Sequence, residues 1–155
     1  MTPKQVLQLI KDKGVVQVDI KFTHSQAGNF AGLRFFVTQK ANGTQNYYCF
    51  LISIDGRFAI WEYQGDNRTP WTFIAAGYGN GIKSGLNQTN RLAILALGQG
   101  AQRRTIFFAN GQYVAQIPMG DSTIATSGGS GLMVFDENTQ AVFSNFALYD
   151  AGNLS

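Results

Sequence analysis

The chain is poor in the residues that build covalent and metal-centred chemistry. Its 155 residues include one cysteine and one histidine. A single cysteine excludes an intrachain disulfide framework, and a single histidine excludes a zinc site made of several histidines within this chain. No apolar run approaches the ~20 residues that a membrane-spanning helix needs. The first residues lack the apolar stretch of a secretory signal. The sequence therefore leaves the compartment open, with an extracellular location expected if the chain is a fragment of an exported protein.

Charge is also scarce. Charged residues make up 14% of the chain, against about 25% in an average soluble domain. Much of the polarity comes instead from 11 Asn and 13 Gln. The net charge of +3 reflects few acids rather than a dense basic field. The densest basic spot, Arg103-Arg104, is typical of a solvated hairpin edge. We therefore expect no nucleic-acid partner.

What the chain does contain is a long series of short strand patterns. Val16–Phe22 alternates apolar and polar residues, as a half-buried strand does. Nine further strands are predicted at Leu33–Val37, Tyr47–Ile54, Arg57–Tyr63, Trp71–Ala75, Arg91–Leu97, Thr105–Ala109, Gln112–Ile117, Gly131–Phe135 and Ala141–Tyr149. Asp55-Gly56 and Asn110-Gly111 lie between neighbouring strands and predict hairpins with type I′ turns. This pattern predicts an all-β protein, an antiparallel sandwich or barrel.

The chain length suits one domain. We interpret residues 1–14 as a short helix or a linker remnant, with Thr2 as N-cap, Pro3 in the first turn and Gly14 at the end. A strand over Val6–Ile10 is the alternative. We expect residues 15–150 to form the sandwich and residues 151–155 to form a tail.

Three pieces of the sequence, in consistent order, carry a resemblance to a known family. They are NYYCFLISIDGRFAIWEY from Asn46, NRLAILALGQGAQRRTIFFANGQYVAQI from Asn90, and GGSGLMVF from Gly128 followed by AVFSNFALYD. Together they resemble the concanavalin A-like lectin/glucanase jelly rolls, which include laminin-G-like domains. The resemblance implies a two-sheet jelly-roll sandwich. It does not choose a function, because such domains serve as adhesion modules, carbohydrate-binding domains and glycoside hydrolases.

The residues argue against catalysis. Glycoside hydrolysis normally needs two carboxylates about 5–9.5 Å apart. The two glutamates are Glu62, expected on a strand at the rim of the core, and Glu137, expected in a turn. His24 falls in a loop, and Cys49 falls inside an apolar strand, where a thiol is a small buried hydrophobe. We expect no enzymatic activity, with a glycoside hydrolase as the least favoured interpretation.

The turns offer oxygen ligands for one metal. Laminin-G-like domains often bind Ca²⁺ through loop carboxylates and carbonyls, so the resemblance implies a possible calcium site, for which the turn at Asp136, Glu137 and Asn138 offers candidate ligands. Asp66-Asn67 and Asp121-Ser122 are further such turns. These residues are also ordinary turn formers. We expect no cofactor other than, at most, a calcium ion.

Aromatic and polar residues gather around one strand. Arg57, Trp61 and Tyr63 share one strand face because alternate residues point the same way, and Phe58 and Ile60 take the other face. The candidate ligand-binding residues are Arg57, Trp61, Tyr63, Asp66, Asn67, Trp71 and Tyr78, the last of these in a polar connection. Flat rings stack on sugars; the alternative is that these rings form a second buried layer. We predict a non-catalytic module that binds carbohydrate or a glycosylated surface, with a structural or protein-interaction module as the alternative.

Overall fold

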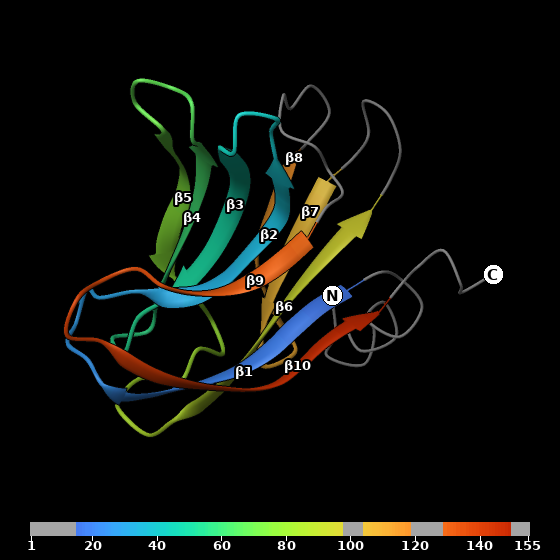
Figure 1. Cartoon of the computed structure of the whole chain (residues 1–155). Coiled ribbons are helices and arrows are strands. Elements are labelled where there is room, and N and C mark those ends of the chain that lie inside the picture. The colour runs from blue at the N-terminus through green and yellow to red at the C-terminus, as the bar shows by residue number, and fades with distance from the viewer. Residues whose placement is uncertain (1–14, 98–103, 119–128, 150–155) are drawn as a thin grey trace.

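Two antiparallel sheets pack face to face (Figure 1). The computed structural model describes residues 15–97, 104–118 and 129–149. Within these ranges lie ten strands: β1 (Val15–His24), β2 (Ala31–Gln39), β3 (Gln45–Ile52), β4 (Arg57–Gln64), β5 (Trp71–Tyr78), β6 (Thr89–Leu97), β7 (Arg104–Ala109), β8 (Gln112–Pro118), β9 (Gly129–Val134) and β10 (Gln140–Tyr149). The first sheet has the order β10-β1-β6-β7-β8, and the second has the order β5-β4-β3-β2-β9. The all-β two-sheet sandwich expected from the sequence is confirmed.

Some expectations fall outside the described residues. The N-terminal helix over residues 1–14, the tail over 151–155, Arg103 and the Asp121-Ser122 turn are among them. Among the residues that are described, none forms a helix long and apolar enough to cross a membrane.

The space between the sheets is filled by aromatic and aliphatic side chains from both. Phe107 on β7 of the first sheet packs edge-to-face against Phe35 on β2, at 5.5 Å, and Phe50 on β3, at 5.0 Å between ring centroids. Phe58 and Ile60 of β4 belong to the same core. Because side chains alternate along a strand, the residues between these core positions on β2, β3 and β4 lie on the outer face of the second sheet.

The two predicted hairpin turns differ. At Asn110-Gly111 both residues have positive φ, 53° and 78°, and the loop is two residues long, so this is a type I′ turn. At Asp55-Gly56 the expectation of a type I′ turn is wrong. There only Gly56 has positive φ, and Ser53 to Gly56 form a four-residue loop closed by Gly56 N–H donating to the Ser53 carbonyl. Asp55 does not adopt a positive φ, and its carboxylate accepts a hydrogen bond from Arg57 Nε at 2.6 Å across the turn.

Candidate functional site

A row of aromatic side chains crosses the outer face of the second sheet. We call it the aromatic face: Tyr47 on β3, Trp61 and Tyr63 on β4, and Trp71 and Phe73 on β5. The strand register brings these rings together, because Tyr63 is paired with both Tyr47 and Trp71, and Trp61 is paired with Phe73. The rings touch in sequence across the strands, as directly opposed cross-strand residues do.

The ring geometry is that of mutually supporting aromatic pairs. Tyr47 and Tyr63 stack with centroids 4.8 Å apart, and Tyr63 lies 4.7 Å from Trp71. Trp61 meets Trp71 and Phe73 edge-to-face, at 6.4 and 5.3 Å. Trp61, Tyr63 and Trp71 are half-buried, and Phe73 is 56% exposed. The rings hold one another in place, and their outer side is open to solvent. The aromatic face is therefore not a fully buried second layer.

A bulge in β5 sets the alignment of this surface. Ile60 is paired with Ala75, but the next residue, Trp61, is paired with Phe73, so Ile74 is the extra residue. Ile74 packs against the core. Bulges re-aim side chains in this way, and here the bulge brings Phe73 onto the same face as Trp61.

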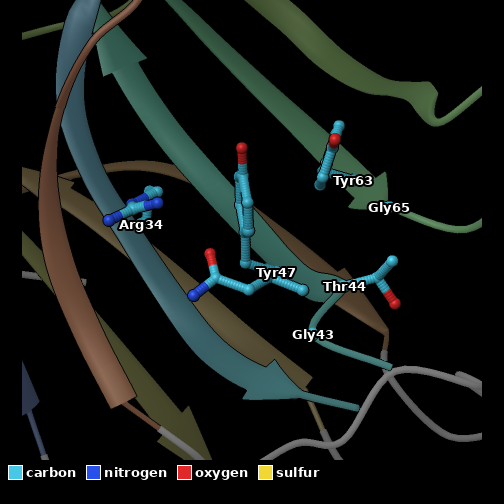
Figure 2. Close-up of a pocket in the computed structure, with 7 residues that line it drawn as sticks. Arg34, Gly43, Thr44, Tyr47, Tyr63 and Gly65 are labelled. Atoms are coloured by element: carbon cyan, nitrogen blue, oxygen red, sulfur yellow. The ribbon is translucent and has the colours of Figure 1, made fainter. Parts of the chain in front are cut away.

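A pocket lies beside the aromatic face, at the end of the sheet where the β2–β3 hairpin turns. It has a volume of about 300 Å³ and is lined by Arg34, Gly43, Thr44, Gln45, Tyr47, Tyr63 and Gly65. Figure 2 shows Arg34, Tyr47 and Tyr63 on three neighbouring strands, with Gly43, Thr44 and Gly65 around the strand ends. The Arg34 guanidinium lies over the Tyr47 ring, 5.3 Å from its centroid. Burial raises the pKa of the Tyr47 hydroxyl, so this group stays protonated at neutral pH and can both donate and accept.

The pocket rim is held by contacts between two loops. Lys40, after β2, forms a salt bridge of 2.8 Å with Asp66, after β4. The Gly65 N–H donates to the Gln45 carbonyl at 3.0 Å. A Cβ at Gly65 would come within 2.7 Å of that same carbonyl oxygen, so glycine is required for this close approach. These contacts fix the two loops of the rim relative to each other.

The predicted binding residues divide into two groups. Trp61, Tyr63 and Trp71 come together on the aromatic face. Asp66 and Asn67 lie in the next loop, where Asp66 pairs with Lys40 and the Asn67 amide donates to the Gln64 side chain.

Arg57 and Tyr78 lie at the other end of β4 and β5. They are opposite each other in the register, and Tyr78 is 76% exposed. Tyr78 ends strand β5, so its expected position in a polar connection is wrong. Arg57 is engaged by Asp55 and does not reach the pocket end of the sheet.

Sequence reasoning missed Arg34, Tyr47 and Phe73. The signal for Arg34 and Tyr47 was present, because each is next to a core aromatic residue, Phe35 or Tyr48, and must therefore point outward. Phe73 shares its strand parity with Trp71 and could have been found in the same way.

The remaining candidates are placed apart from this surface. Asp136 uses its carboxylate to accept the Phe30 N–H at 2.7 Å, and Asn138 has a positive φ of 60° in the same turn. Glu137 is exposed there. Within the described ranges no group of three or more His, Cys, Asp or Glu side chains could hold a metal ion. Calcium at this turn stays a prediction.

The structure does not bring the two glutamates together. Glu62 lies on β4 opposite Tyr48 and accepts from the Gln64 amide at 2.7 Å, and Glu137 lies in the turn after β9, at the far edge of the same sheet. His24 ends β1 and is exposed. Cys49 is buried, and burial raises the pKa of its thiol to about 12. These four side chains do not form a nucleophile–base pair or a carboxylate pair.

Comparison with known proteins defines the fold class. No protein-family model matches the chain. No curated protein matches it either. Among solved structures, sheep galectin-11 (LGALS11) in complex with glycerol matches with a TM-score of 0.60 and 12% identity, over 90% of this chain and 92% of that chain. The chain therefore shares the two-sheet jelly-roll sandwich fold of that structure. The likeness is to a galectin and gives no support to the laminin-G-like subtype in particular.

Proposed function

We propose that the chain is a non-catalytic carbohydrate-binding module and that glycans bind on the aromatic face. The observation that carries this proposal is the continuous row of rings from Tyr47 to Phe73 on an open sheet face. Sugar rings have apolar faces that stack on such side chains, and their hydroxyls bond to nearby amides and hydroxyls. The pocket supplies these groups from Thr44, Gln45 and Tyr47. The fold likeness to a galectin supports the same conclusion.

A glycan array followed by titration calorimetry tests the proposal. Phe73→Ala is the sharpest variant, because Phe73 is 56% exposed and its loss leaves no closed cavity. We expect it to weaken binding by ~1–3 kcal/mol, the range known for one aromatic stacking contact with a base and used here for a sugar ring. Tyr113→Ala is the matched control, since Tyr113 is an exposed ring, at 45%, on β8 of the other sheet. An array on which no glycan binds the wild-type chain would overturn the proposal.

Protein association is the second candidate function. It is favoured by exposed apolar side chains on the edge strands of the two sheets: Leu132 and Val134 on β9, and Val142 and Phe146 on β10, each 41–49% exposed. Apolar patches that stay exposed often mark interaction surfaces. Sedimentation velocity over a hundredfold concentration range tests for self-association, and a single concentration-independent species with no glycan affinity would leave a different protein as the partner to seek.

A further inference from the structure

Arg34 carries a charge that the described part of the chain does not neutralise. The ion pairs found there join Lys40 to Asp66, Arg57 to Asp55 and Arg91 to Asp19, and Arg34 takes part in none of them. Its Nε atom is buried and has no hydrogen-bond partner. A partly buried guanidinium without a carboxylate partner is costly, because water no longer solvates it fully and no anion replaces that water. Such a group is usually kept for a reason other than stability.

The backbone around Arg34 holds this arginine in one place. A bulge follows it directly: the β2–β9 register shifts between Arg34 and Val37, and Phe36 adopts a φ of 52°. Positive φ is strained for a bulky residue and persists only where its surroundings enforce it. Here both Phe35 and Phe36 pack into the core, with their rings 5.0 Å apart. The bulge thus anchors the strand on the core side while Arg34 stays on the outer side.

The two neighbours of the guanidinium also fix its position. On β9, a Cβ at Gly131 would lie 3.3 Å from Arg34 Nη2, so the glycine leaves the room in which the guanidinium lies. On β3, Tyr47 supports the guanidinium with its ring face, 5.3 Å from centroid to Cζ. Arg34 is therefore oriented before any ligand arrives, which reduces the entropy lost on binding.

The pocket that Arg34 lines has no acidic residue in its wall. Two acids are adjacent in sequence to wall residues: Asp66, after Gly65, is engaged by Lys40 at 2.8 Å, and Glu62, before Tyr63, accepts from the Gln64 amide at 2.7 Å. The other polar side chains of the wall are Thr44, Gln45, Tyr47 and Tyr63, which can all donate hydrogen bonds. A volume of about 300 Å³ is at the small end for ligand sites, the size of a single sugar unit with its substituent.

From this geometry we infer that the pocket binds the anionic group, a carboxylate or a sulfate ester, of an acidic glycan. This inference rests on the proposed function, because a neighbouring sugar of the same glycan would stack on Tyr63 and Trp71, whose rings are 4.7 Å apart. The planar guanidinium fork matches both anions, and a charge-assisted pair is about twice as strong as a neutral hydrogen bond. Binding would supply Arg34 with the anionic partner that the described part of the chain does not provide.

The test uses matched sugars that differ only in the anion. Lactose and cellobiose are titrated alongside their sulfated and carboxylated forms, against wild type, Arg34→Gln, Arg34→Lys and Arg104→Gln. Arg104 is an exposed arginine on β7 of the other sheet, so its variant removes the same charge elsewhere. We expect wild type to bind at least one anionic form ~10-fold or more tightly than its neutral parent, the effect of one charge-assisted hydrogen bond. The sulfated and carboxylated arms show which anion is preferred.

Arg34→Gln should abolish this preference, and Arg104→Gln should leave both the preference and the binding of the neutral sugars unchanged. Arg34→Lys, which keeps the charge without the fork, should retain only part of it. Equal binding of neutral and anionic forms by wild type would overturn this inference and leave the proposed function standing. Binding of none of the sugars on the array would overturn both. Thermal unfolding adds an independent readout: the melting temperature of Arg34→Gln should equal or exceed that of wild type, and a large fall would show that Arg34 is structural.

Discussion

At the scale of single residues, Asp19 on β1 of the first sheet has a carboxylate that accepts three side-chain hydrogen bonds. It accepts from Arg91 Nε at 2.7 Å and Nη2 at 3.1 Å, and from Asn145 Nδ2 at 2.8 Å. The hydrogen bonds from Arg91 are the main reason why the pKa of Asp19 is lowered. A lowered pKa means that the folded state holds the proton less tightly than the unfolded state. The stability from this group is therefore present above the unfolded pKa of about 3.9 and is lost as the pH falls through the folded value.

We expect Asp19→Asn to lower the free energy of unfolding at pH 7 by ~1–2 kcal/mol, a value reduced because the Arg91 side chain is 51% exposed. Below pH 4 the difference between variant and wild type should shrink. Urea unfolding at a series of pH values measures both effects. Asp66→Asn is the control: its pKa is also lowered, chiefly by Lys40, but both side chains of this pair are exposed to solvent, so little stability should change. A pH-independent difference for Asp19→Asn would contradict the assignment.

Cys49 gives a second prediction at this scale. The thiol is buried, and burial raises its pKa to about 12, so almost no thiolate is present at pH 8. We expect Cys49 to resist iodoacetamide in the folded chain and to react promptly in 6 M guanidinium chloride. The ratio of the two alkylation rates, read by mass spectrometry, measures this protection. Rapid labelling of the native chain would show that this part of β3 opens readily.

At the scale of elements, the β7–β8 hairpin depends on one asparagine. Asn110 has a φ of 53°, and its amide donates to the Gly81 carbonyl at 2.6 Å and to Asn90 Oδ1 at 2.8 Å. Its Oδ1 accepts the Arg91 N–H at 2.8 Å. The turn residue therefore also ties the hairpin to the loop before β6.

These two roles can be separated. Asn110→Gly keeps access to positive φ but loses the side-chain hydrogen bonds, and we expect a cost of ~1–3 kcal/mol. Asn110→Ala loses both, so it should cost about 1 kcal/mol more, the penalty of a left-handed residue with a Cβ. Denaturant midpoints with unchanged slopes measure the difference. Equal stability of the two variants would show that the backbone conformation of this turn contributes nothing.

The elements also show what could be predicted from the sequence. Strand patterns and the turn residues between them predicted each of the ten strands found in the described residues, and alternation placed Trp61 and Tyr63 opposite Phe58 and Ile60, as observed. Alternation fails where a bulge inserts a residue. The bulge at Phe36 and the one at Ile74 change which side chains share a face, and neither has a glycine or a turn residue that marks it in the sequence. Arg34 precedes the Phe36 bulge and was missed for another reason: its alternation with core Phe35 placed it on the outer face, but nothing in the sequence marked that face as a pocket.

At the scale of the whole molecule, aromatic residues serve two different surfaces. Phe107 joins the two sheets through Phe35 and Phe50 and is fully buried. Trp61 and Phe73 lie on the outer face of one sheet, in contact with each other and open to solvent on one side. The sequence alone could not assign rings to one surface or the other, because strand parity separates the faces of a sheet but does not tell which face another layer covers.

A series of three alanine variants measures this division. Phe107→Ala should cost ~3–5 kcal/mol of unfolding free energy, because it leaves a cavity between the sheets. Phe73→Ala should cost less than ~1 kcal/mol, since the ring is 56% exposed. Trp61→Ala should fall between them, at ~1–3 kcal/mol, because the ring is half-buried and loses edge contacts with Trp71 and Phe73. Urea unfolding of the three variants in one buffer gives the values.

The order of these costs decides between the two interpretations of the aromatic face. A binding surface tolerates truncation with small losses of stability and large losses of glycan affinity, whereas a second core layer behaves in the opposite way. A cost for Trp61→Ala equal to that of Phe107→Ala, with no change in affinity for any glycan, would assign the aromatic face to structure and favour the protein-interaction alternative. The expected order, with Phe73→Ala affecting affinity much more than stability, would instead show that these rings are kept on the open face for a ligand.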